Sequence, residues 1–132
     1  MATANLNNTG VQVITGNDSI VIVENLEAIR GGRTLDVTGF APEVIKSGHV
    51  IIRATSSGEY KPMPLTTNDT VYAALPASHE YAGILVASIL TAKPFAGIMV
   101  RGTVNPAAAP FSMTSILAAV NAALPVIQFR QD

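Results

Sequence analysis

The stretch PFAGIMVRGTVNP, residues 94–106, decides the fold of this 132-residue chain. Residues 95–100 are small or apolar almost without a break, and Gly102 and two β-branched residues follow Arg101. An apolar run of this length between two prolines is typical of a buried β-strand. We therefore predict a buried strand over residues 96–104. The stretch carries no pattern of a metal site or a phosphate loop, so we expect its role to be structural.

Segments on both sides of this stretch also predict strands. Their residues alternate in polarity or are β-branched, as is typical of strands, and the segments are 11–14, 19–26, 34–40, 49–55, 67–75 and 126–132. Residues 81–90 fit either a buried strand or a short helix, and residues 41–48 fit a short helical turn or a loop. Gly31 and Gly32 indicate a turn. Pro62 and Pro64 confine their extended segment to a sheet edge.

One clear helix is predicted, near the end of the chain. Residues 112–124 place four apolar side chains on one face, with Ser112 as the N-cap and Pro125 as the stop; the four are Ile116, Leu117, Val120 and Leu124. The predicted fold class is therefore mainly β with one C-terminal α-helix (α+β). We expect an extended, flexible N-terminal arm over residues 1–14 and a single β-rich domain over residues 15–132.

The composition limits the classes of function. Hydrophobic residues make up 48% of the chain and charged residues 13%, against a usual charged share of about a quarter. So little charge favours a partner that covers part of the apolar surface. The net charge of −1, with no basic run, argues against nucleic-acid binding. We expect a soluble chain made in the cytoplasm, because no signal peptide or long apolar span is visible.

The search for catalytic and metal-binding patterns gives no site. HEYAG (79–83) begins like a zinc-protease motif, but Gly83 stands where the second His is required. The carboxylates are spread singly, no Cys is present, and the two histidines, His49 and His79, lack a neighbouring carboxylate cluster. Arg30 to Arg33 could contact an anion through backbone N–H groups, although an exposed turn is the simpler interpretation. We therefore predict no enzyme activity, no cofactor and no metal.

Two segments carry a resemblance to a known family. They are GGRTLDVTGFAPEVIKSGHVIIRAT (31–55) and EYAGILVASILTAKPFAGIMVRGTVNP (80–106). In the second segment, YAGILV and the later AGIMVRGTVN look like the paired strands of lambda-type head decoration proteins. Over a little more than a third of its length, the chain thus resembles the decoration and head-fibre proteins of tailed-bacteriophage capsids. No collagen-like or heptad repeat is present, so we expect no long fibre.

The resemblance implies a non-enzymatic structural protein on the outer surface of a virion. It implies binding to the major capsid protein and stabilisation of the expanded head, as a homotrimer at threefold or quasi-threefold positions, with no nucleic acid and no membrane bound. In that family the N-terminal arm adds to a sheet edge of the capsid, which assigns capsid binding here to Val11, Gln12, Val13 and Ile14. Backbone pairing of this kind is physically sound, and three arms on one trimer bind with a high effective concentration.

The same interpretation places a subunit interface in the second half of the chain. We predict that Met99, Arg101, Phe111 and Ile116 contribute to it. We expect the C-terminal helix or the Ala-rich loop 105–111 to face a neighbouring subunit. The small side chains of residues 107–109 let two backbones approach closely, and Phe111 is the expected anchor.

Two other functions remain open from the sequence. The first is a small trimeric ligand- or carbohydrate-binding adhesion module on a virion, for which Tyr60, Tyr72 and Tyr81 are the only tyrosines. The second is a trimeric enzyme whose site lies between subunits, with His49 or His79 near Asp36.

Overall fold

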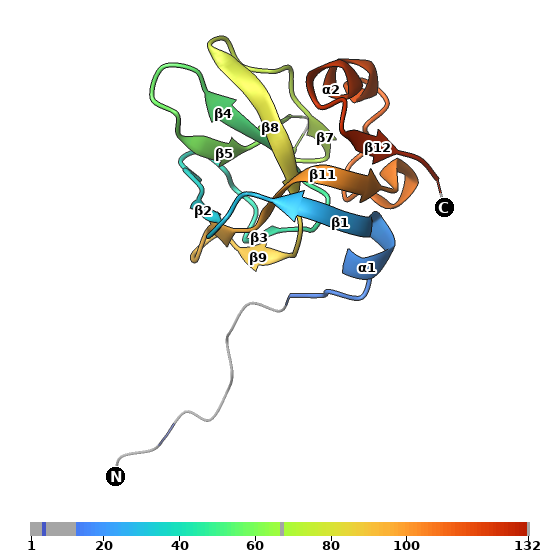
Figure 1. The fold of residues 1–132 in the computed structure, drawn as a ribbon. Helices are drawn as coiled ribbons and strands as arrows, with labels where there is room; N and C mark the ends of the chain where they lie inside the picture. The colour runs from blue at the N-terminus through green and yellow to red at the C-terminus, as the bar shows by residue number, and fades with distance from the viewer. Residues whose placement is uncertain (1–3, 5–12, 67, 132) are drawn as a thin grey trace.

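The structure is a computed structural model that describes residue 4, residues 13–66 and residues 68–131. It confirms the predicted fold class, a compact and mainly β-sheet domain with one C-terminal helix (Figure 1). Val11 and Gln12, half of the predicted arm strand, lie outside the described residues. Val13 and Ile14 are described and form no strand, so that part of the predicted strand over residues 11–14 is wrong.

A six-stranded sheet forms the centre of the domain. Its order is β1(Ile22–Ala28), β11(Ile98–Val104), β8(His79–Leu85), β4(Val50–Ala54) and β5(Tyr60–Pro62), all antiparallel. The last strand, β12(Ile127–Phe129), pairs in parallel with the end of β11. The opening stretch of the sequence therefore supplies the strand with the most partners.

Three two-stranded sheets surround this centre. They are β2(Arg33–Thr34) with β10(Phe95–Ala96), β3(Val44–Ile45) with β9(Ile89–Leu90), and β6(Leu65–Thr66) with β7(Val71–Tyr72). Two α-helices, α1(Asp18–Val21) and α2(Leu117–Ala123), and one 3₁₀ turn, η1(Pro106–Ala108), complete the described part of the chain.

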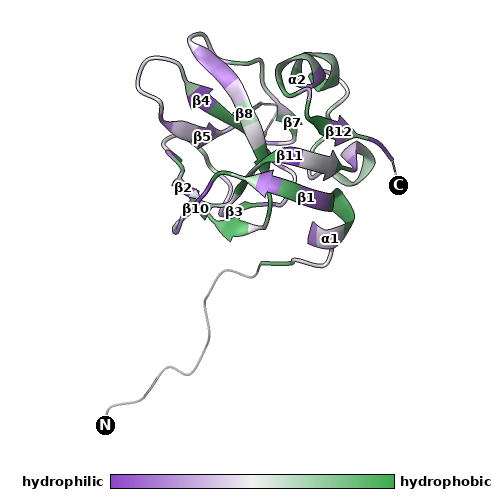
Figure 2. Cartoon of the chain, in the orientation of Figure 1, coloured by the Kyte–Doolittle hydropathy of each residue, from purple (hydrophilic) through white to green (hydrophobic). Residues whose placement is uncertain are grey.

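The middle of the central sheet is buried on both faces. Neighbouring residues of a strand point to opposite faces, and in β4 the side chains of Val50 and Ile52 join one core cluster while Ile51 joins the other. The end of β8 divides in the same way between Ile84 and Leu85. Figure 2 shows the change along β8, from a hydrophilic start to a hydrophobic end. Continuous apolar runs in β4, β8 and β11 follow from this double burial.

Several predicted elements are confirmed. The strands over 49–55 and 96–104 appear as β4 and β11, and the ambiguous segment 81–90 forms strands rather than a helix. Pro62 ends β5, which is the edge strand of the central sheet, as predicted.

Other predicted elements are wrong, each for a local reason. The strand predicted over residues 34–40 is interrupted, because the Asp36 carboxylate accepts the backbone N–H of Thr38 at 3.1 Å and forms a turn. The predicted strand 19–26 begins as the helix α1. Residues 41–48 contain β3, which was not predicted. The C-terminal helix begins only at Leu117, since the Ser112 hydroxyl bonds Thr114 and caps no helix.

Candidate functional site

Large apolar side chains are exposed in one continuous part of the chain. Among the described residues seven such side chains are exposed, and four of them fall within residues 14–26. These four form what we call the N-terminal strip: Ile14 (71% exposed), Ile20 (51%), Val23 (38%) and Leu26 (57%). A concentration of apolar surface on a chain of low charge marks a contact surface. The strip is therefore the candidate functional site.

The strand β1 presents half of the strip at an open sheet edge. Its only strand neighbour among the described residues is β11, and its five inner residues, 23–27, are all exposed. The pairing with β11 skips Val23 and Leu26, so each is the extra residue of a β-bulge. Bulges at sheet edges redirect side chains. Here they turn two aliphatic side chains outward and break the regular edge that would invite non-specific strand pairing.

Gly102 makes this bulged pairing possible. Its φ of 154° is one that residues with a Cβ rarely adopt, and a Cβ there would collide with the backbone carbonyl of Glu24. Glycine therefore lets the backbone of β11 approach β1 closely at the bulges. The shape of the edge depends on this one residue of the opening stretch.

A hydrogen-bond network fixes the helix that precedes β1. The Asp18 carboxylate accepts the backbone N–H of Ser88 at 3.0 Å and its hydroxyl at 2.8 Å. The Ser88 hydroxyl in turn accepts the N–H of Ser47 at 3.0 Å, and the Ser47 hydroxyl donates to the carbonyl of Val86 at 2.7 Å. The network holds α1 against the loop after β8, so the strip begins from a fixed point.

A cleft of about 270 Å³ lies beside α1, where the described N-terminal part of the chain enters the domain. It is lined by Ile14, Asn17, Asp18, Val21, Lys46, Ser47, Ser88 and residues 108–110. Residues 108–110 come from the Ala-rich loop that was predicted to face a neighbour. The loop is shaped by Asn105, whose side chain accepts the N–H of Ala107 at 3.0 Å. The strip and the predicted loop therefore meet at one cleft.

The structure separates the predicted interface residues. Met99 is fully buried and Ile116 is 7% exposed, and both belong to the core. Both side chains pack inside the single chain and leave little surface for a partner, so their contact with another subunit stays a prediction. Arg101 is exposed and pairs in register with Glu27 of β1, beside the strip. Phe111 is half-buried.

Phe111 anchors its loop inside the molecule. Its ring centre lies 5.7 Å from that of His49 and 5.5 Å from that of Tyr72, in edge-on geometry, and the ring centre of Phe40 lies 5.5 Å from that of His49. Such contacts stabilise a core. The interactions seen for Phe111 are thus internal.

His49 is enclosed by these aromatic rings and has no exposed surface. Its Nε2 donates to the carbonyl of Met63 at 2.9 Å, so the unprotonated nitrogen is Nδ1, which has no hydrogen-bond partner. Burial lowers the pKa of His49 to about 4, and the hydrogen bond to Met63 opposes this only in part. A neutral, enclosed imidazole of this kind is a structural group, and Asp36 is exposed at the surface.

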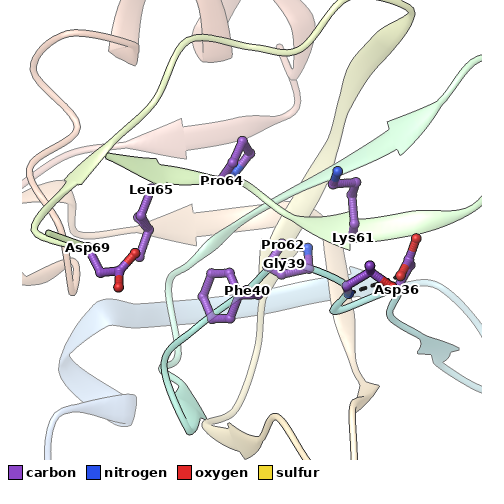
Figure 3. A pocket seen from close by; sticks show the side chains of 9 residues that line it. Asp36, Gly39, Phe40, Lys61, Pro62, Pro64, Leu65 and Asp69 are labelled. Carbon is purple, nitrogen blue, oxygen red and sulfur yellow. Dashed lines mark hydrogen bonds between the residues drawn. The ribbon is translucent and has the colours of Figure 1, made fainter. Parts of the chain in front are cut away.

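A small pocket of about 70 Å³ is lined by three charged residues, Asp36, Lys61 and Asp69, and by apolar ones. Figure 3 shows Asp36 and Asp69 at opposite sides of it, with Lys61 near Asp36 and Phe40 between the two carboxylates. Hydrogen bonds from Thr38, with Lys61 nearby, lower the pKa of the Asp36 carboxyl. The separation of the two acids prevents them from acting as a pair.

The tyrosines are engaged within the fold. Tyr72 is buried, and its hydroxyl accepts the N–H of Val50 at 3.2 Å. The guanidinium groups of Arg33 and Arg53 lie 5.9 and 6.0 Å from the ring centre of Tyr60. Tyr72 therefore has no exposed ring for stacking on a sugar, and the ring of Tyr60 already has two cations close to it.

No group of three acidic or histidine side chains is placed to hold a metal ion in the part of the chain that the structure describes. None of the described helices is long and apolar enough to cross a membrane. Comparisons with protein-family models, with curated proteins and with solved structures give no significant match.

Proposed function

We propose that this protein is a non-enzymatic structural protein that binds the outer surface of a phage capsid and stabilises the expanded head. In this proposal it binds the major capsid protein as a homotrimer at threefold or quasi-threefold positions. The resemblance of residues 31–55 and 80–106 to lambda-type decoration proteins suggests the partner. The N-terminal strip is the observation that carries the proposal.

The strip supports an assembly role through its physical character. Its four side chains expose aliphatic surface on consecutive segments of the chain, with only two charged residues, Glu24 and Glu27, interspersed on β1. Burial of aliphatic surface contributes about 25 cal/mol per Å². A decoration protein needs such a surface on each copy, because many identical contacts must be made on one shell.

The position of the strip supports a role for the N-terminal segment in the same contact. Ile14 is the most exposed large apolar side chain among the described residues. It is also the last residue of the predicted capsid-binding segment. An arm that docks from this point would continue the strip onto the capsid. Linked contacts of an arm and a folded surface raise the affinity through effective concentration.

Sedimentation with capsids tests the proposal. Purified protein is mixed with expanded heads that lack a decoration protein, the heads are pelleted, and the copies per head are counted. We expect saturation at a number that fits the threefold positions of the shell. A chain without residues 2–14 should bind at least tenfold more weakly, and Ile20→Glu should reduce binding similarly.

A matched control uses Val71→Glu, because Val71 is an exposed aliphatic residue (40%) on β7, outside the strip. This variant should bind like the wild type. Absence of wild-type protein from the pellet at every concentration would refute the capsid role.

A further inference from the structure

A second exposed surface of the molecule complements the strand β1. Phe95, at 63% exposed, is the most exposed aromatic residue that the structure describes. It pairs with Thr34 in the two-stranded sheet of β2 and β10, and its ring lies over Gly32, where an added Cβ would come within 3.3 Å of the ring. The backbone and the Gly32 turn therefore hold an exposed ring in a fixed position.

Three cationic residues lie on the chain segments next to this ring. Lys93 precedes it by two residues, and the turn before β2 brings Arg30 and Arg33 to the same corner, all three exposed. The Arg33 guanidinium donates to the carbonyls of Gly32 at 2.7 Å and Arg30 at 3.3 Å, which ties it to the turn. The three cations make no ion pair with any described residue. We call this surface, Arg30, Arg33, Lys93 and Phe95, the β2–β10 corner.

The edge formed by β1 has the opposite character. Its bulges expose Val23 and Leu26, and the carboxylates of Glu24 and Glu27 alternate with them. Neither carboxylate has an ion-pair partner among the described residues. One surface is thus an exposed aromatic ring with three cations on neighbouring segments, and the other is a pair of aliphatic side chains with two anions and one facing cation, Arg101. Contact between them would bury apolar area and pair opposite charges at the rim.

The two surfaces follow one another along the chain without overlapping. β1 ends at Ala28, and the next residues lead into the corner at Arg30 (Figure 1). One copy can therefore offer its edge to one neighbour and its corner to another. Contacts between unlike surfaces of identical subunits are heterologous, and they close into a ring when the rotation between subunits allows it.

We infer that the β1 edge of one copy docks on the β2–β10 corner of a second copy of this chain. Each molecule carries both complementary surfaces. A second copy of the chain is therefore the partner that matches them. The inference deepens the proposed function by naming a contact between copies of the chain. Only the expectation that the ring has three members rests on that function.

Cysteine cross-linking in solution tests the contact without any capsid. The chain has no Cys, so Leu26→Cys with Phe95→Cys creates the only thiols, and a disulfide requires Cα atoms within about 7 Å. Under mild oxidation this double variant should give covalent oligomers up to a trimer, at least fivefold more than the control pair Leu26→Cys with Val71→Cys.

Equal yields from the two pairs would overturn the inference. Efficient cross-linking by Leu26→Cys alone would also overturn it, because it would place β1 against β1. Unfolding transitions of all variants, measured in parallel, show that the folded protein is being compared.

Charge reversal supplies an independent readout in the same assay. Glu24→Lys with Glu27→Lys should lower the cross-linking yield at least fivefold, and so should Arg30→Glu with Lys93→Glu. A chain carrying all four reversals should recover the yield, because each edge again meets a corner of opposite charge. Glu59→Lys, on the hairpin between β4 and β5, is the control. Failure of the fourfold variant to recover would contradict the docking. Because no heads are present, these results are independent of whether the protein binds capsids.

Discussion

β5 and β1 are the two ends of the five-strand path of the central sheet, and they differ in how the chain protects them. β5 has three residues and ends at the buried Pro62, which has no N–H to offer. The carbonyl of Tyr60 accepts the N–H of Asp36 at 2.8 Å, so another segment of the same chain covers this edge. β1 has seven residues, five of them exposed in succession, and none of the described segments covers its outer side.

This difference shows which edge of the sheet the chain covers by itself and which edge it leaves uncovered. A short edge with a proline and a covering segment is protected against further pairing. The long β1 edge is protected only by its bulges, which carry aliphatic side chains outward. We therefore regard β5 as the closed edge and β1 as the open edge, and the predictions below test this distinction.

The largest effect is expected from Gly102→Val, which disrupts the pairing of β11 with β1 at the open edge. A valine Cβ collides with the carbonyl of Glu24 and requires a φ that β-branched residues avoid. We expect a loss of about 3 to 5 kcal/mol in the free energy of unfolding, measured by urea denaturation. Gly16→Ala is the control, since nothing lies within 4 Å of its Cβ position. A loss below about 1 kcal/mol for Gly102→Val would contradict the close approach.

The next effect concerns the closed edge and depends on pH. His49 holds the carbonyl of Met63, the residue after β5, and its folded pKa of about 4 lies below the ordinary value of 6.5. Between these values the unfolded chain binds more protons, so stability is full above pH 6.5 and falls as the pH drops toward 4. The loss is about 3 kcal/mol over this window.

His49→Gln should remove this contribution, because glutamine does not titrate. The measurement is the free energy of unfolding of both proteins at pH 7 and pH 5. The wild type should lose about 2 kcal/mol more than the variant over that interval. Parallel losses in the two proteins would show that His49 is not held neutral.

A smaller effect is expected at the start of the open edge. Asp18→Ala removes both hydrogen bonds to Ser88, and we expect a loss of about 1 to 2 kcal/mol in the free energy of unfolding. The exposed neighbour Ser19 gives the matched control Ser19→Ala, which should stay within about 0.5 kcal/mol of the wild type. Equal effects of the two substitutions would mean that the network does not fix α1.

The smallest effect on folding is expected on the surface of the open edge. Leu26→Glu replaces a side chain that is 57% exposed, so the free energy of unfolding should change by less than about 0.5 kcal/mol. Copies bound per head should nevertheless fall at least tenfold relative to Val71→Glu. Normal binding by Leu26→Glu would separate the open edge from assembly.

The closed edge can be predicted from the sequence better than the open edge. Pro62 predicts an edge by itself, and the apolar runs of β4 and β11 predict buried strands because both faces of the sheet are covered. In contrast, the run SIVIV (19–23) predicts a strand throughout, whereas its first three residues belong to the helix α1, where the Asp18 carboxylate accepts tertiary hydrogen bonds from Ser88. Bonds between residues 70 positions apart leave no local signal.

The candidate site shows the same limit. The polar residues Glu24, Asn25 and Glu27 among aliphatic ones signal an exposed strand, but nothing local signals that Val23 and Leu26 are bulged. The bulges arise across the sheet, where Gly102 meets β1. Met99 and Arg101 lie two residues apart on β11, yet one is buried and the other exposed. The pairing with β1 shifts between them and skips Val100, which no local pattern signals.

Hydrogen–deuterium exchange tests the distinction between the two edges most directly. Peptides that cover residues 19–28 and 58–66 are followed in the free protein and in protein bound to expanded heads. We predict that exchange in the β1 peptide slows at least tenfold on the heads, while exchange in the β5 peptide, already covered in the single chain, stays unchanged. Equal exchange of the β1 peptide in both states would contradict the claim that the open edge is covered by assembly.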